Sequence, residues 1–301
     1  MTASERGAVK DAAESSAQDF YRSVLCALTD SGPPFLVGGG YALRPYTGLA
    51  RASRDFDVFL RRKDVRRALR SAAGLGYATE LTFPHWLAKI RKGDHYVDLI
   101  FNSGNGLTPV DDDWFHHATR ARVFDVDVRL CPMEEMIVSK AFIMERERFD
   151  GADILHLLYA GAERLQWPRL LARFGEHWEV LLTHLVLFGF VYPDHRARIP
   201  ADVMDALLSR LEWERRRPAS DTGLCRGTLL SRAQYLVDVE EWGLRDARLD
   251  PDVEMTAGEV ELWTRAVPPE VRPAAEGPER VIEKVPDGGS EPPSGKDRLS
   301  K

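Results

Sequence analysis

The sequence predicts an α+β protein in which a mixed sheet with helices packed on it comes first and an all-α domain follows. Two observations predict the first half: short apolar runs alternate with amphipathic helical segments, and clusters of glycine and proline separate them. A third observation predicts the second half, because the pattern from Pro132 to about residue 249 is helical and is punctuated only by prolines and glycines. A chain of 301 residues is long enough for two compact domains.

The elements of the first half follow one another along the chain. An amphipathic helix is expected over residues 8–29, because Phe20, Val24 and Leu28 recur at four-residue spacing. The segment 30–34 stops it. A buried strand at 35–37, a helix opening at 41–44, a strand at 56–60, an arginine-rich helix at 63–75, two strands around a Lys-Gly-Asp turn within 86–101, and one strand over 121–130 come next.

Three regions follow from this pattern. Residues 1–131 are the expected sheet-containing domain, and residues 132–266 are the expected helical domain, which Pro132 opens. Residues 267–301 contain many prolines and glycines and few apolar residues, so we expect a disordered tail.

Composition and charge exclude several classes of protein. Hydrophobic residues make up 44% and charged residues 29% of the chain, which is typical of a folded globular protein, and the net charge of -6 argues against wholesale capture of nucleic acid. The three cysteines are widely spaced and suggest neither a disulfide framework nor a zinc site. No apolar stretch is long enough to span a membrane. A cytoplasmic location without membrane association is expected.

A glycine turn follows the first predicted strand. Gly38, Gly39 and Gly40 lead directly into a predicted helix, which places unhindered backbone N–H groups at a helix N-terminus. Such a turn can bind phosphate, although a tight strand-to-helix turn with no ligand has the same pattern.

Paired acids stand on the next strand. Asp55 and Asp57 point to one face because they are two residues apart, while Phe56 and Val58 face the core. Two adjacent carboxylates suit Mg²⁺, with nucleotide phosphates completing its ligand shell. Asp125 and Asp127 have the same spacing but follow no glycine turn, and we interpret them as a solvated face.

A third acid, Asp98, lies in an otherwise apolar predicted strand, where an unpaired charge would be costly. A phosphate-binding turn, paired acids on one strand and a single acid on a later strand form a recognisable constellation. Three carboxylates of this kind can hold two Mg²⁺ ions, bind a triphosphate, activate a hydroxyl and stabilise leaving pyrophosphate.

These motifs resemble those of the DNA polymerase β-like nucleotidyltransferase superfamily, with Gly39-Gly40, then Asp55 and Asp57, then Asp98. Within it the chain is most similar to nucleotidyltransferases related to abortive-infection toxins of type IV toxin–antitoxin systems, and more distantly to small-molecule and antibiotic nucleotidyltransferases. The toxin-like proteins carry a lysine, then arginine, then an Asp-x-x-Asp segment, which are matched here by Lys140, Arg146, Arg148, Asp150 and Asp153. The likeness covers residues 35 to about 158, and glycine replaces the serine that many relatives have after the first glycine.

The resemblance implies a nucleotidyltransferase fold followed by a helical domain, and transfer of a nucleoside monophosphate from NTP to an acceptor hydroxyl. It implies Mg²⁺, two ions or Mn²⁺ as a substitute, at Asp55, Asp57 and Asp98, with Asp98 also helping to deprotonate the acceptor. Lys140 would offset phosphate charge as a point charge, or be an ordinary solvated lysine. The other residues expected at the nucleotide are Gly38, Gly39, Gly40, Arg44, Arg54 and Asp153. Asp153 could equally be a helix cap, since aspartate is a favoured N-cap residue.

The acceptor is the open question. Nine basic residues could hold an RNA backbone, such as that of tRNA, or form a solvated face: Arg44, Arg51, Arg54, Arg61, Arg62, Lys63, Arg66, Arg67 and Arg70. RNA, with an antitoxin as protein partner, is the first hypothesis. A small hydroxylated molecule is the alternative, and a catalytically silent nucleotide- or RNA-binding relative is another. The segments at 111–113 and 116–117 are interpreted as a polar loop with a helix cap, and "RGTLLS" at 226–231 carries no assigned chemistry.

Overall fold

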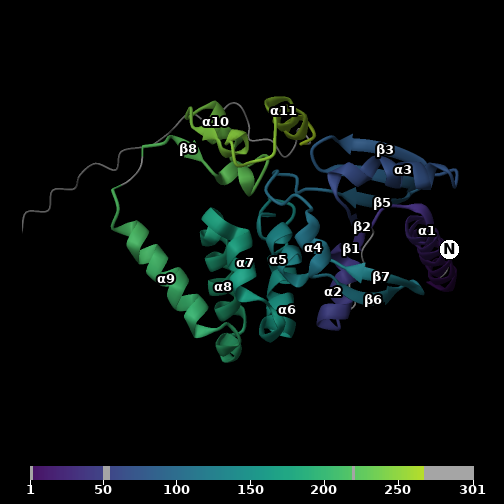
Figure 1. Ribbon diagram of the computed structural model, residues 1–301, viewed down its shortest axis with the longest axis horizontal. Coiled ribbons are helices and arrows are strands. Elements are labelled where there is room, and N and C mark those ends of the chain that lie inside the picture. Colours follow the sequence, from purple (N-terminus) through teal and green to yellow (C-terminus); the bar gives the residue numbers. More distant parts are fainter. Residues whose placement is uncertain (1–2, 50–54, 219–220, 268–301) are drawn as a thin grey trace, which may run out of the picture.

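The computed structural model describes residues 3–49, 55–218 and 221–267. In Figure 1 a sheet lies on the right, a group of helices extends to the left, and the last described segment runs across the top. The α+β class predicted from the sequence is therefore observed, with most strands in the first half and most helices in the second.

A mixed sheet of seven strands has the order β3-β4-β5-β2-β1-β7-β6. Strand β2 pairs in parallel with β5, and β1 pairs in parallel with β7, whereas β1 and β2 are antiparallel to each other. Two antiparallel ladders, β3-β4-β5 and β6-β7, extend the sheet on either side. The strands are β1 (Leu36–Val37), β2 (Phe56–Phe59), β3 (Ala78–Phe83), β4 (Leu87–Lys92), β5 (His95–Ile100), β6 (Thr119–Val123) and β7 (Val126–Leu130).

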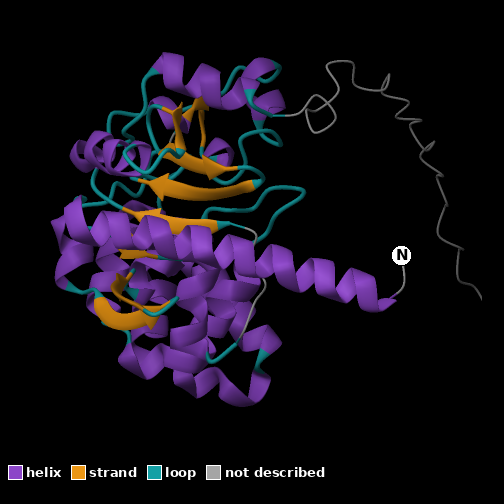
Figure 2. Cartoon of the chain, turned by 90° about the vertical axis from the view of Figure 1, so that its right-hand side faces the viewer, coloured by secondary structure: helices purple, strands orange, loops and turns teal. Residues whose placement is uncertain are grey.

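Helix α1 (Ala3–Ser31) covers the predicted 8–29 helix and crosses one face of the sheet, as Figure 2 shows. Its apolar side buries Phe20, Val24 and Leu28 with no more than 2% exposure, and the Tyr21 ring stacks on Phe56 of β2. Burying each such side chain contributes roughly 1.5–3 kcal/mol. Three shorter helices complete this half: α2 (Gly39–Thr47), α3 (Val65–Ala73) and α4 (Asp112–His116).

The second half is mainly helical, and its helix α6 packs against α2 of the first half. Its longer helices are α5 (Met133–Ala141), α6 (Gly151–Gly161), α7 (Trp167–Phe174), α8 (Trp178–Val191) and α9 (Ala201–Arg215), followed by α10 (Leu236–Glu240) and α11 (Ala257–Arg265). Short 3-10 turns connect them and precede α3: η1 (Arg62–Asp64), η2 (Ala162–Arg164), η3 (Gly175–His177), η4 (Pro193–Arg198), η5 (Gly227–Leu229) and η6 (Ala247–Leu249).

Three details differ from the expectations. Residues 121–130 were expected as one strand but belong to a hairpin, because Phe124 and Asp125 take left-handed backbone conformations (φ 48° and 61°) that suit a tight turn. Strand β3 was not predicted. A parallel strand pair, β8 (Leu224–Cys225) with β9 (Arg245–Asp246), interrupts the segment expected to be wholly helical.

The last described segment folds back on the sheet. Helix α11 contacts β3, and Trp263 packs edge-on against the rings of Phe83 and Trp86. Val267, the first residue of the expected tail, is described and buried, and residues 268–301 lie outside the described ranges. No helix within those ranges combines the length and apolar character needed to cross a membrane.

Candidate active site

The glycine turn brings the backbone directly against Asp57. Strand β1 ends at Val37, and the Gly38 N–H donates to the backbone carbonyl of Asp57 at 3.0 Å. A Cβ on Gly39 would lie 1.7 Å from Asp57 Oδ2, and one on Gly38 would lie 2.2 Å from the Phe59 ring. Gly39 also has φ +55°, a conformation that side chains disfavour. Glycine is therefore required here for close approach.

Helix α2 starts at this point, with Gly38 as its N-cap and Gly40 as its second residue. No side chain caps the helix, and its first turn contains no acidic residue. Its unpaired N–H groups and the positive end of its dipole therefore begin beside Asp57, which suits an anion such as phosphate.

The three predicted carboxylates are brought together. Asp57 of β2 and Asp98 of β5 are direct partners across the parallel strand pair. Asp55 lies in the bend just before β2, two residues from Asp57, so its side chain leaves the backbone on the same side. The three acids thus lie on, or directly before, two neighbouring central strands of the sheet.

Two of the three acids have a specific partner. Lys89 Nζ lies 2.5 Å from Asp98 Oδ1, and Tyr96 Oη donates to Asp55 Oδ1 at 2.6 Å. In the described part of the chain, Asp57 has neither a side-chain hydrogen bond nor an ion pair. Its charge is therefore the least compensated of the three.

Burial raises the pKa of Asp57 from 3.8 to about 6, and the charges of Asp98 and Asp55 add to the effect. Burial also raises the pKa of Asp98, although the bond from Lys89 opposes it. The hydrogen bond to Asp55 raises the pKa of the Tyr96 hydroxyl, so Tyr96 is a neutral donor near pH 7. Asp57 is the group that would gain most from a nearby cation.

A second charged cluster lies at the junction of α5 and α6. Lys140 Nζ is 2.6 Å from Asp150 Oδ2 and 2.8 Å from Asp153 Oδ2, and the Arg148 guanidinium binds both oxygens of Asp150 at 2.9 Å. Burial acts against ionisation, yet the Arg148 and Lys140 contacts hold the pKa of Asp150 down to about 2. Lys140 thus already contacts two carboxylates, and its role toward phosphate stays a prediction.

The two clusters are electrostatically linked. The positive charges of Lys140 and Arg148 partly offset the burial that raises the pKa of Asp57. The hydrogen bond to Asp150 is the main cause of the raised pKa of Arg148. The negative charges of Asp57 and Asp55 raise it further. The motif residues near 140–153 therefore act on the carboxylates of the sheet.

Arg44 and Arg54 are the two arginines expected at the nucleotide. Arg44 lies exposed in the last turn of α2. Arg54, with Arg51, falls outside the described residues. That Arg44 and Arg54 contact the nucleotide therefore stays a prediction.

Two of the three acids suit a divalent ion as ligands. Within residues 3–49, 55–218 and 221–267, no group of three or more His, Cys, Asp or Glu side chains is arranged to hold a metal. The expected set of three acids is not gathered as one such group. Asp57 nevertheless fits an ion together with Asp55, because it is a partly buried carboxylate with no described side-chain hydrogen bond, and a second carboxylate stands two residues away.

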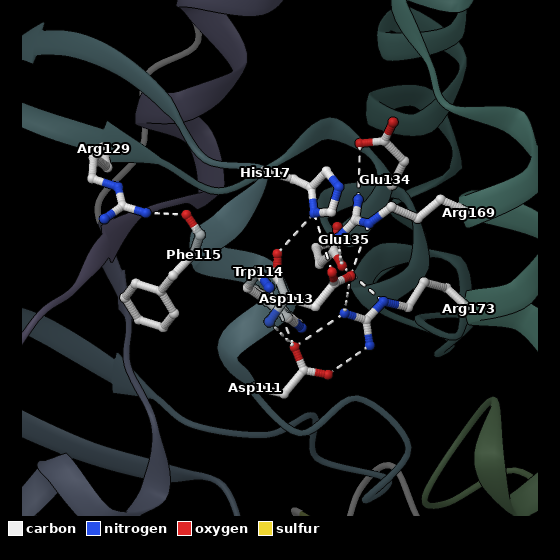
Figure 3. A network of polar contacts seen from close by, with 10 residues as sticks. All are labelled: Asp111, Asp113, Trp114, Phe115, His117, Arg129, Glu134, Glu135, Arg169 and Arg173. Carbon is white, nitrogen blue, oxygen red and sulfur yellow. Dashed lines mark hydrogen bonds and ion pairs between the residues drawn. The ribbon is translucent and has the colours of Figure 1, made fainter.

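A separate charged network joins the sheet half to the helices, and sequence reasoning did not identify it. Figure 3 shows Arg169 and Arg173 of α7, which both form ion pairs with Asp113 of α4 and with Glu135 of α5. Arg169 also contacts Glu134 at 3.3 Å. The network is structural, since its acids are already paired with arginines.

The Asp111–Asp113 segment behaves as predicted. Asp111 accepts hydrogen bonds from the backbone N–H groups of Asp113 and Trp114 and caps α4. The exposed pair Asp125 and Asp127 lies on the β6-β7 hairpin, away from the glycine turn, as a solvated face. The predicted solvated face is thus observed for Asp125 and Asp127.

The predicted basic patch is divided. Arg61 pairs with Asp112 and Asp64, and Arg62 lies 3.7 Å from Glu259. Arg67 lines a cavity of about 860 Å³ with Arg120, Arg129 and others, and none of the three sheet acids lines it. Among the described residues of the patch, Arg61 and Arg62 are therefore engaged by acids, and Arg67 lies at a cavity apart from the three sheet acids.

The "RGTLLS" segment connects the two halves. The Leu229 carbonyl accepts from Asn105 Nδ2 at 2.8 Å, and the Leu230 carbonyl accepts from the Met144 N–H at 3.1 Å. Ser231 Oγ donates to Glu145 Oε2 at 2.5 Å. This segment ties the loop after β5 to the loop that carries Arg148, which no local sequence pattern indicates.

No family model and no curated protein matches the sequence. Among solved structures, the antibiotic-resistance factor ANT(2'')-Ia in solution is 18% identical with a TM-score of 0.39, covering 56% of this chain and 97% of its own. The lincosamide antibiotic adenylyltransferase LnuA is 16% identical with a TM-score of 0.34, covering 48% and 96%. JHP933 from Helicobacter pylori is 12% identical with a TM-score of 0.32, covering 66% and 94%. Likeness at this level assigns no function.

Proposed function

We propose that this protein is a divalent-cation-dependent nucleotidyltransferase that moves a nucleoside monophosphate from NTP to an acceptor hydroxyl. One observation carries the proposal: Asp57, a carboxylate with a raised pKa and no described side-chain hydrogen bond, lies across from Asp98 and against the first residue of α2. Negative side chains and a positive helix end at one point suit a cation and a phosphate group together.

The residues of the site have three different roles. Asp55 and Asp57 would hold Mg²⁺, or Mn²⁺ in its place, and the N–H groups at the start of α2 would receive phosphate oxygens. A bound Mg²⁺ supplies charge neutralisation on the phosphates and favours deprotonation of the acceptor hydroxyl. Lys140 and Arg148 supply positive charge at longer range.

The reaction is a displacement at the α-phosphorus. The acceptor oxygen forms a bond to that phosphorus, the bond to the bridging oxygen breaks, and pyrophosphate leaves with the electron pair. Asp98, on the adjacent strand, accepts the hydroxyl proton. Burial keeps the pKa of Asp98 raised, which makes its carboxylate a better proton acceptor than an exposed one.

A small hydroxylated molecule is the acceptor that the structure favours. Arg61 and Arg62 of the basic patch are already paired with acids, and Arg67 lines a cavity apart from the sheet acids. An RNA backbone would need a continuous basic surface leading to the catalytic carboxylates. An RNA acceptor and an antitoxin partner stay predictions, and the test below includes RNA.

The test is an acceptor screen. Purified protein is incubated with each α-³²P-labelled NTP, Mg²⁺ and either total tRNA or hydroxyl-rich small molecules, among them tobramycin and lincomycin. Label in a small molecule, dependent on Mg²⁺ and lost in the Asp57→Asn variant, is the expected result. Label in tRNA instead would keep the chemistry but overturn the proposed acceptor.

Binding of nucleotide without transfer to any acceptor class would favour a catalytically silent relative. Nucleotide binding is followed in parallel by equilibrium dialysis of the labelled NTP, so that a missing acceptor and a missing nucleotide site are distinguished. Failure to bind any NTP in the presence of Mg²⁺ would contradict the proposal as a whole.

A further inference from the structure

Lys89 is placed at the active site by the register of the sheet. Strands β4 and β5 are antiparallel, and their register sets Lys89 directly opposite Asp98. The Nζ–Oδ1 distance is 2.5 Å, and the two side chains are only 16% and 15% exposed. Because both residues lie inside regular strands, this contact does not depend on a loop.

The aromatic ring of Tyr96 holds the lysine in a second way. Lys89 Nζ lies 4.2 Å from the centroid of the Tyr96 ring, while the hydroxyl of the same tyrosine donates to Asp55. An ammonium group over an aromatic face is attracted by the ring quadrupole. Lys89, Tyr96, Asp98 and Asp55 therefore form one connected unit along the acid face of the sheet.

The three acids thus offer different sites to a cation. A divalent ion at Asp57 meets a carboxylate that has no hydrogen bond or ion pair with a described side chain. At Asp98 the same ion would have to share the carboxylate with Lys89 or displace it. Removing one partner from a poorly exposed ion pair leaves the other charge uncompensated, which is costly. Binding at Asp57 is therefore favoured over binding at Asp98.

We propose that Lys89 is a built-in cation of the active site, which takes at Asp98 the place of a second divalent ion. The site then binds one divalent ion with its nucleoside triphosphate, at Asp57 and Asp55, in place of the two ions that the sequence led us to expect. This inference rests on the proposed nucleotidyltransferase function and names the cation arrangement of that same site.

The test counts bound Mn²⁺ ions by electron paramagnetic resonance in the presence of a non-hydrolysable NTP analogue. The full-length wild-type protein is expected to bind one ion per chain, and Lys89→Met is expected to bind two, because the freed Asp98 becomes available. Lys89→Arg keeps a cation and is expected to retain one. Lys92→Met, an exposed lysine of the same strand that pairs with His95, is the matched control and should also retain one.

Two ions on the wild-type protein would overturn the inference, and so would an unchanged count in Lys89→Met. The wild-type count decides the matter even if Lys89→Met does not fold, which circular dichroism checks. Two ions together with Asp57-dependent nucleotidyl transfer would overturn only the role of Lys89. No bound Mn²⁺ on any variant would overturn both this inference and the metal-dependent function.

Discussion

Gly39 lies against Asp57 so closely that a single added carbon would collide with the carboxylate, 1.7 Å from Oδ2. The glycine sits at the first position of α2 with φ +55°, and Asp57 lies in β2. The turn and the acid are therefore one structural unit. The glycines that the sequence suggested as a phosphate site also determine where the carboxylate can be.

Gly39→Ala is expected to reduce nucleotidyl transfer by roughly 100-fold or more, because Asp57 must move away from the start of α2. Gly48→Ala is the control: Gly48 ends the same helix with φ +75°, but nothing lies within 4 Å of an added Cβ. It should lose about 1 kcal/mol of stability and keep its activity. Equal activity losses in the two variants would contradict the account.

The pKa of Asp57 makes stability depend on pH. A folded-state pKa of about 6, raised from 3.8, gives a contribution to stability that is complete below about pH 4 and is lost as pH rises through 6. Asp57→Asn resembles the protonated form, so it should match wild type near pH 4 and be more stable at pH 7–8. The gain is up to about 3 kcal/mol, since one pKa unit corresponds to about 1.4 kcal/mol.

Urea unfolding at several pH values measures this difference. Asp127→Asn, at an exposed acid with the same local spacing, is the control and should stay within about 0.5 kcal/mol of wild type. An Asp57→Asn protein that is less stable than wild type at pH 8 would show that Asp57 is already compensated in the fold.

Lys140→Met should destabilise the protein by about 3 kcal/mol or more, because Asp150 and Asp153 would lose their shared partner while 7% and 5% exposed. Arg265→Met breaks an exposed pair with Glu261 and should cost less than about 1 kcal/mol. Guanidinium unfolding curves compare the two. Equal effects would mean that the Lys140 cluster is solvated and does not fix the α5–α6 junction.

Arg169→Met tests the network in Figure 3. Asp113 would lose one of its two arginines, Glu134 and Glu135 would lose a partner each, and a loss of about 3–5 kcal/mol is expected. Hydrogen exchange should rise first in α7 and α4, which the arginine joins. Arg216→Met, which removes a surface contact to Glu212, provides the comparison. Unchanged exchange in α4 would contradict the joining role.

The sequence revealed the acids because their chemistry conflicts with their surroundings. Asp57 and Asp98 are charged residues in apolar strands, a local signal that a single sequence displays. Lys89 could also have been found: the Gly93-Asp94 turn fixes the β4–β5 register, and counting back from it places Lys89 opposite Asp98.

Other features had no local signal. Strand β3 is exposed over most of its length and lacks apolar alternation, and the β6-β7 turn uses Phe124 and Asp125 where glycine or asparagine would be expected. The contacts between Arg169 and Glu135 join residues far apart in the chain. Such pairings depend on how helices pack, which periodicity along one helix does not specify.

The most direct test of the central claim is pyrophosphate release from NTP with Mg²⁺ and pooled hydroxylated acceptors, compared between wild type, Asp57→Asn and Asp127→Asn. The account predicts release by wild type and Asp127→Asn, and a loss of at least about 1,000-fold in Asp57→Asn, as for removal of a central transition-state contact. Equal release by all three proteins would contradict the claim that Asp57 is the centre of the active site.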